Sequence, residues 1–226
     1  MLTRRALVAA LPLTLLARPA FATEEQDLVD RARITVDGFV RDAEFAEMRR
    51  LLPRAKGVIV FPSIFKAGFI IGGEGGNGVL VGRDANTGAW TAPSFITMGA
   101  GSVGLQIGAE ASEVMLLIMT DNGLRAVLSN QVKLGADASI AVGPIGKGVE
   151  ASTTTALRAD IYSFAKSRGL FGGVSLEGAV LASRDSMNQK YYGRAITPEA
   201  IVIRREVEAP NAALLQDALR RAEAKS

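Results

Sequence analysis

Hydrophobic positions recur at helical spacing near both ends of the chain. The positions between residues 24 and 52 that would form one apolar stripe are Leu28, Ala32, Thr35, Val36, Phe39 and Ala43. Thr23 and the acids after it suit a helix start, and Pro53 predicts its end. Near the other end, Asn211 can cap a helix whose buried face would be Leu214, Leu215, Ala218, Leu219 and Ala222. The pattern therefore predicts one helix over 24–52 and another over 211–225.

Between these ends, residues 57–193 show short apolar runs separated by glycine-bearing turns, which is typical of β-strands. All but one of the 24 glycines lie in this part of the chain. Glycines within strands favour bending, as in a sheet that curls towards a barrel. The expected strands are Gly57–Phe61, Phe69–Ile71, Val79–Gly82, Ala89–Phe95, Val103–Ala109, Glu113–Met119, Ala138–Val142, Asp160–Ala165 and Val174–Ala182. Short helices are expected near Leu124–Leu128 and over Ser186–Tyr191.

Together these patterns predict an α+β fold. The expected architecture is a glycine-rich, mainly antiparallel, curved or barrel-like sheet packed by N- and C-terminal helices. No linker composition and no strict repeat interrupts the sequence after residue 22. Residues 23–226 are therefore expected to form a single domain.

The first 22 residues have the pattern of an export signal. Arg4 and Arg5 precede an apolar run over 6–17, and the small residues at 20–22 fit signal peptidase. The run is shorter than the ~20 residues of a membrane span. The arginine pair resembles a twin-arginine motif, but ordinary secretory signals also carry such pairs, so both export routes stay open. The sequence predicts a periplasmic or secreted bacterial protein.

Composition removes several classes of chemistry. The chain has no cysteine and no histidine, which excludes disulfides, thiolate zinc sites, a Cys nucleophile and a Ser-His-Asp triad. The signal contains three of the 26 basic residues and no acid, so the remainder has 23 bases against 23 acids. A neutral chain does not fit a general nucleic-acid binder. No cofactor and no metal is expected.

Two glycine-rich stretches resemble phosphate-binding loops. Residues 99–104 match G-x-G-x-x-G, but 105–109 alternate like a strand where a dinucleotide site needs a helix, so a bent strand is favoured. The backbone amides of residues 72–78 could cradle a phosphate. No Lys-Ser/Thr pair follows that stretch, and a tight turn or bulge between strands is favoured.

Two acids, Glu110 and Glu177, lie in apolar runs flanked by glycine. A carboxylate-dependent hydrolase would need them to converge in one cleft, roughly 5–10 Å apart. Pairing of each acid with a basic side chain is the simpler interpretation.

Cations adjoin apolar residues at two expected turns. One turn contains Lys166, Arg168, Leu170 and Phe171, and the other has Lys66 and Phe69. An exposed apolar tip beside cations is what contact with an anionic membrane surface requires. The alternative is an ordinary turn whose phenylalanine folds back into the core.

Several stretches, in order along nearly all of residues 55–193, together resemble the SYLF lipid-binding domain family, which is also described as an actin-binding domain in eukaryotic members. The stretches that carry the resemblance are Ala55–Pro62, Gly78–Leu80, Trp90–Phe95, Gly101–Glu110, Ala141–Gly146, Ile161–Ser163, Lys166–Gly178 and Tyr191–Gly193.

The resemblance implies a non-enzymatic domain that binds phospholipids, with phosphoinositides as the eukaryotic ligands. The predicted function is phospholipid or membrane-surface binding in the bacterial cell envelope. A structural or interaction module that pairs with an envelope protein is the alternative. Because an exported bacterial protein does not meet cytoplasmic actin, actin is not expected as its partner.

Overall fold

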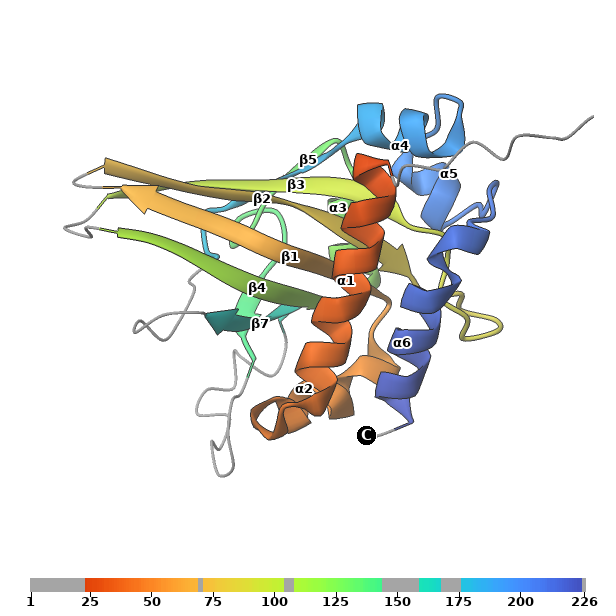
Figure 1. Ribbon diagram of the computed structural model, residues 1–226, viewed down its shortest axis with the longest axis horizontal. Coiled ribbons are helices and arrows are strands. Elements are labelled where there is room, and N and C mark those ends of the chain that lie inside the picture. Colours follow the sequence, from red (N-terminus) through yellow and green to blue (C-terminus); the bar gives the residue numbers. More distant parts are fainter. Residues whose placement is uncertain (1–22, 69–70, 104–107, 144–158, 168–175, 225–226) are drawn as a thin grey trace, which may run out of the picture.

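The computed structural model describes residues 23–68, 71–103, 108–143, 159–167 and 176–224 (Figure 1). The strands are β1 (Gly57–Gly68), β2 (Ile71–Gly82), β3 (Ser94–Val103), β4 (Gly108–Ile118), β5 (Gln131–Lys133), β6 (Ile140–Val142), β7 (Ile161–Ser167) and β8 (Val180–Ser183). The α-helices are α1 (Glu24–Arg41), α2 (Ala46–Leu51), α3 (Asp121–Leu128), α4 (Asp185–Tyr192), α5 (Pro198–Val202) and α6 (Ala213–Glu223). Short 3₁₀ turns are η1 (Ala43–Phe45), η2 (Leu52–Arg54) and η4 (Pro210–Ala212).

The strands form one curled sheet in the order β5-β8-β3-β2-β1-β4-β7-β6 (Figure 1). Neighbours are antiparallel except for the parallel pair β6–β7. With helices packed against this sheet, the α+β prediction is confirmed. The sheet is buried on both faces near its base, because successive side chains of a strand point to opposite sides. In β1, for example, Val58 and Val60 pack beneath the helices, whereas Ile59 and Phe61 pack on the inner side of the curl.

Helices α1 and α6 lie side by side over the outer face of the sheet (Figure 1). The Thr23 hydroxyl caps α1 by accepting a hydrogen bond from the Gln26 N–H at 3.2 Å. Helix α1 buries Ala32, Val36 and Phe39 of the predicted stripe, whereas Val29 is buried where Leu28, now partly buried, was expected. The inner face of the curl is covered instead by residues of α3, α5, β5 and β8, including Val127, Ile201 and Leu181.

The helix predicted over 24–52 is in fact broken. Asp42 adopts an extended conformation at the end of α1, and its carboxylate accepts a hydrogen bond from the Glu44 N–H that starts η1. The break turns the chain so that Phe45 packs edge-on against Phe39, with 4.5 Å between the ring centroids. The C-terminal helix is confirmed over 213–223, after the 3₁₀ turn η4.

Two other local predictions need correction. Residues 72–78 were expected to form a turn or a bulge between strands, but they lie within β2. The bulge is in the neighbouring strand, because the β1–β2 register shifts between Val60 and Phe65. Residues 89–93 are not part of β3, which starts at Ser94; Trp90 makes only an isolated bridge to Arg83. Next to this bridge, the Thr91 N–H donates to the Gly82 carbonyl oxygen at 2.9 Å, and the Gly82 N–H donates to the Thr91 hydroxyl, also at 2.9 Å.

Residues 99–103 of the G-x-G-x-x-G stretch are extended backbone in β3, and residues 104–107 lie outside the described residues. Strand β4 begins at Gly108, close to where a dinucleotide-binding turn would be followed by a helix. The strand prediction therefore holds for residues 99–103.

Candidate functional site

The far ends of β1 to β4 project beyond the helical layer (Figure 1). We call this part the sheet arm: residues 64–68, 71–77, 98–103 and 108–112. Its β2 segment contains four glycines, and a Cβ at Gly99 or Gly101 would meet no atom within 4 Å. Phe65 stands out among these small residues, because its side chain is 56% exposed. The sheet arm is therefore a thin extension with little apolar packing of its own.

Register places the two lysines chosen from the sequence on opposite faces of the sheet. Lys66 pairs with Glu110 of β4, whereas Lys166 pairs with Glu113 of the same strand. Residues 110 and 113 differ by an odd number of positions, so the two rows face opposite sides. Lys166 faces the helical layer and Lys66 faces the inside of the curl. The two cations cannot form one patch.

Lys66 also pairs in register with Glu74 of β2. Burial raises the pKa of the Glu74 carboxyl, and the charge of Lys66 opposes that rise. The inner face of the sheet arm thus carries an acid that is partly withdrawn from water beside a single lysine. This arrangement reduces the free positive charge that Lys66 offers to an anion.

Lys166 is held by the junction between α1 and η1. Its ammonium donates to the Asp42 carboxylate at 2.9 Å, and the Lys166 side chain remains 38% exposed. The hydrogen bond from Lys166 and the one from the Glu44 backbone lower the pKa of Asp42. Arg168, Leu170, Phe171 and Phe69 lie outside the described residues.

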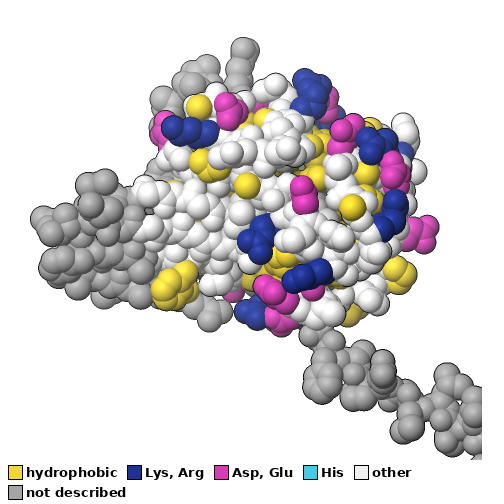
Figure 2. Space-filling view, turned by 90° about the horizontal axis from the view of Figure 1, so that it is seen from above, with side chains coloured by type: hydrophobic (Ala, Val, Ile, Leu, Met, Phe, Trp, Pro, Cys, Tyr) yellow, Lys and Arg dark blue, Asp and Glu magenta, His cyan; other side chains and the backbone are white. Residues whose placement is uncertain are grey.

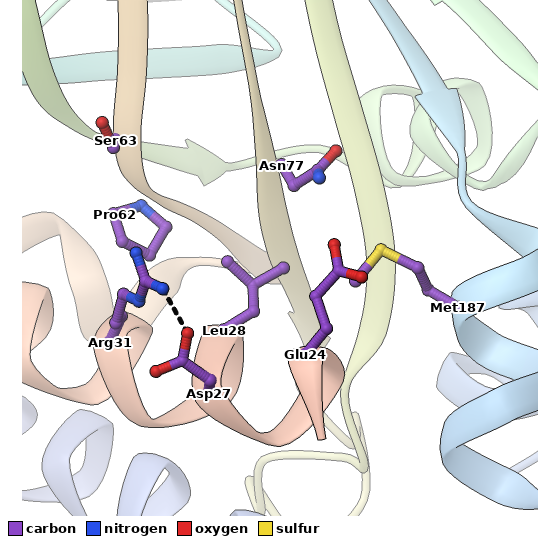
Figure 3. A pocket seen from close by; sticks show the side chains of 8 residues that line it. All are labelled: Glu24, Asp27, Leu28, Arg31, Pro62, Ser63, Asn77 and Met187. Atoms are coloured by element: carbon purple, nitrogen blue, oxygen red, sulfur yellow. Dashed lines mark hydrogen bonds and ion pairs between the residues drawn. The ribbon is translucent and has the colours of Figure 1, made fainter. Parts of the chain in front are cut away.

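A cavity of 210 Å³ lies between α1 and the sheet, beside the β1 bulge (Figure 3). Its lining residues are Glu24, Asp27, Leu28, Arg31, Pro62, Ser63, Asn77 and Met187. Figure 3 shows Glu24 and Asn77 on one side of the cavity, the Arg31–Asp27 ion pair on the other, and Leu28 between them. The sequence pattern does not predict this site. Its one local sign is a polar residue, Asn77, between two glycines.

The predicted carboxylate pair gains no support. Glu177 is exposed in a turn before β8, and the side chain of Glu110 is not among those described. No group of three or more acidic side chains in the described ranges is arranged to hold a metal ion. No described helix is long and apolar enough to cross a membrane.

Charges of both signs are scattered over the surface. On the face in Figure 2, Lys and Arg side chains alternate with Asp and Glu and form no broad patch of one sign. Many belong to ion pairs, such as Arg204 with Glu206 at 2.6 Å and Arg220 with Asp217 at 2.9 Å. The described part of this face therefore offers no wide electrostatic platform.

Comparison with known proteins identifies the family of this chain. A family model named Ysc84 and described as "Las17-binding protein actin regulator" matches residues 99–222, more than half of the chain. Protein YSC84 of Saccharomyces cerevisiae is 35% identical over 166 residues, covering 72% of this chain and 35% of that protein. SH3 domain-containing YSC84-like protein 1 of Homo sapiens is 36% identical over 143 residues, covering 63% of this chain and 41% of that protein.

A third relative, LAS seventeen-binding protein 3 of Saccharomyces cerevisiae, is 34% identical over 155 residues, covering 67% of this chain and 33% of that protein. The chain thus spans about a third to two fifths of the length of these curated relatives. The family match begins within β3 at residue 99 and covers the later elements as far as residue 222 of α6, while β1 and β2 lie before it. The chain belongs to the Ysc84 family, the SYLF family whose resemblance the sequence carries.

Proposed function

We propose that the chain is a non-enzymatic binding module that attaches to anionic phospholipid surfaces through the sheet arm and the loops beside it. Membership of a family described by what it binds and regulates supports a binding role. The observation that carries the lipid proposal is the exposure of Phe65 on a projecting part of the sheet.

The described residues beside Phe65 leave its ring largely uncovered, with the residue 56% exposed. Its register neighbours are Gly75 on β2 and Ala111 on β4, which are too small to bury it. The sheet arm extends away from α1 at this point (Figure 1). A projecting aromatic side chain gains free energy by entering the boundary between head groups and acyl chains. Cations close to such an anchor add attraction to anionic lipids.

The remaining residues proposed for lipid contact come from the sequence: Lys166, Arg168, Leu170, Phe171, Lys66 and Phe69. Strand β7 ends opposite Ser112, four residues before the outer end of β4. Lys166 and Phe65 pair with Glu113 and Ala111, which lie on the same face of β4, so these two side chains support a shared contact region on the helical side of the sheet.

Vesicle flotation tests the proposal. We expect the protein, lacking residues 1–22, to float with vesicles of phosphatidylcholine and phosphatidylglycerol and not with phosphatidylcholine alone. Phe65→Ser should weaken binding about tenfold or more, since burying a Phe side chain contributes ~1.5–3 kcal/mol. Ile34→Ser is the matched control, because Ile34 on α1 is 53% exposed but lies away from the sheet arm. Equal loss in both variants, or no flotation of the parent, would refute the proposal.

The Asp42–Lys166 pair offers a variant with the opposite effect. Asp42→Asn should free the Lys166 cation, while the amide oxygen can still accept the Glu44 N–H. We expect stronger binding to anionic vesicles, by about the 1 kcal/mol that a cation near such a surface contributes. Asp42→Asn combined with Lys166→Met should remove that gain.

A protein-interaction module is the second candidate. The description of the family, which refers to Las17 binding and actin regulation, and the name of LAS seventeen-binding protein 3 favour it. For this chain we propose an envelope protein as that partner, captured by the purified protein in a pull-down. A stable protein complex without any vesicle binding would select this candidate over the lipid one.

We also propose export to the bacterial cell envelope, with residues 1–22 removed. The start of α1 supports it, because Thr23 caps the helix and would be the first residue left after cleavage. The mass of the protein isolated from cells that make it should match a chain that starts at Thr23. An intact leader would count against export.

A further inference from the structure

The cavity beside the β1 bulge is built by matched features of two strands. The bulge puts Ser63 against Gly76 of β2, and the Phe61 side chain that precedes it against Gly78. A Cβ at Gly76 would lie 2.3 Å from the Ser63 carbonyl oxygen, and one at Gly78 would lie 2.6 Å from the Phe61 ring. Both glycines are thus needed for the bulge to fit. Bulges of this kind often aim a side chain at a functional site.

Between those glycines, Asn77 faces the helical layer and lines the cavity. No hydrogen bond or ion pair joins the side chain of Asn77, Ser63 or Glu24 to another described residue. The cavity therefore presents a carboxylate, an amide and a hydroxyl with free hydrogen-bonding capacity. Leu28 and Met187 supply an apolar wall between them.

Charge selects the ligand. Glu24 and Asp27 contribute two negative charges and Arg31 one positive charge, so the lining has a net charge of −1. Arg31 is already ion-paired with Asp27, and its hydrogen bond lowers the pKa of that carboxyl. Glu24 remains as the carboxylate without a protein partner in the described residues. The complementary group is a cation with a hydrocarbon stem.

Size limits the ligand to one side chain. At ~30 Å³ per water molecule, 210 Å³ corresponds to about seven waters. Pockets for drug-sized ligands measure ~300–1,000 Å³. A lysine side chain matches both the size and the chemistry, because its methylenes can lie along Leu28 while its ammonium meets Glu24 and Asn77. A phosphoethanolamine head group fits less well, since the Arg31 that would meet its phosphate is already paired.

We propose that this cavity receives a lysine side chain from a protein partner. The site is distinct from the sheet arm contacts proposed above, because it lies between α1 and the base of the arm. Phe65 is not among the residues that line the cavity, so Phe65→Ser tests lipid binding without changing the lysine site. Failure of the lysine-binding test would therefore leave the lipid proposal intact, and failure of vesicle binding would leave the lysine site intact.

Titration followed by NMR tests the site with Nα-acetyl-lysine N-methylamide as the probe. We expect shifts at the Asn77 side-chain amide and the Ser63 backbone amide, with a dissociation constant on the order of 1 mM for so small a ligand. The norleucine analogue has the same stem without the ammonium and should bind at least about threefold more weakly. Equal binding of the two analogues would overturn the proposal.

Two variants locate the contact. Glu24→Gln should weaken lysine-probe binding about threefold, and Asn77→Leu should abolish it by filling the cavity. Glu44→Gln is the matched control, because it makes the same charge change beyond the other end of α1, about 27 Å away at ~1.5 Å per residue over 18 residues. Equal weakening by Glu44→Gln would show a general charge effect and refute the site. O-phosphoethanolamine binding more tightly than the lysine probe would assign the cavity to a lipid head group instead.

Discussion

The base of the sheet and the sheet arm are made from the same strands but are stabilised differently. At the base, Val58, Phe61 and Leu116 are fully buried between the helical layer and the inner face of the curl. In the sheet arm, the same strands are rich in glycine, alanine and serine, and Ile64 and Met98 are the side chains there that still belong to the described core. Apolar burial dominates folding free energy. The base therefore sets the stability of the fold, and the arm presents a surface.

The largest expected effect comes from breaking the base. Phe39→Ala removes a side chain that is 0% exposed and packs against Phe45. We expect a loss of about 3–5 kcal/mol in the free energy of unfolding, from lost burial and the cavity left behind. Ile34→Ala on the same helix, where the side chain is 53% exposed, should change it by less than about 0.5 kcal/mol. Urea denaturation measures both; similar losses would show that α1 is not anchored by its buried stripe.

A second experiment separates the bulge from the rest of the sheet arm. Gly76→Ala should cost about 1–3 kcal/mol, because the new methyl group would meet the Ser63 carbonyl oxygen at 2.3 Å. Gly99→Ala is the matched change on β3, where nothing lies within 4 Å of the new Cβ. It should leave the unfolding free energy unchanged or slightly higher. If both variants melt alike, the bulge is not tightly fitted.

A carboxylate at the base should make stability fall in acid. Burial raises the pKa of Asp160, but hydrogen bonds from Thr120, Ser139 and Asn122 outweigh it, so the pKa lies below the ordinary 3.8. Its contribution is present above the unfolded-state pKa and is lost as the pH falls through that value and below. Asp160→Asn should cost about 1–3 kcal/mol at neutral pH and flatten the acid limb. Unfolding measured from pH 7 down to pH 3 tests this, and an unchanged slope would contradict it.

Glu74 in the sheet arm should show the smallest effect, with the opposite sign. Its raised pKa means that its carboxyl destabilises the fold as the pH rises through the folded-state value. Glu74→Gln should therefore increase stability at neutral pH by less than about 1 kcal/mol, because Lys66 compensates part of the penalty. Thermal melts at pH 7 and pH 4 should show this gain only at the higher pH. A loss at pH 7 would mean that the ion pair outweighs burial.

Local patterns in the sequence were enough to predict the helices and strands that depend on residues close together in the chain. The stripe through Ala32, Val36 and Phe39 predicts α1, and the short helix expected near Leu124–Leu128 is confirmed as α3. The alternating pattern after residue 104 favours a strand over a dinucleotide-binding turn, and residues 99–103 lie in β3. These features need only the spacing of a few consecutive residues.

The parts that could not be predicted depend on contacts between distant segments. Lys166 meets Asp42 across 124 positions, and no local pattern indicates that pairing. Residues 72–78 have the composition of a turn. Their glycines are explained only by the fold, in which β2 lies against the bulge of β1. Nor could Lys66 and Lys166 be assigned to opposite faces without the β4 register. Register is fixed by the whole sheet rather than by any one strand.

The β1 bulge has a consequence for everything beyond it. Phe61 and Ile64 are three positions apart, yet both lie on the inner face, where an unbroken strand would alternate. The extra residue therefore inverts the parity of the pleat, so that Phe65 points outward and Lys66 inward. If the same sequence paired without the bulge, regular alternation would exchange these two side chains, whereas deleting Ser63 would remove the bulge and keep both orientations. One extra residue in β1 thus decides whether the outer surface of the sheet arm is aromatic or cationic.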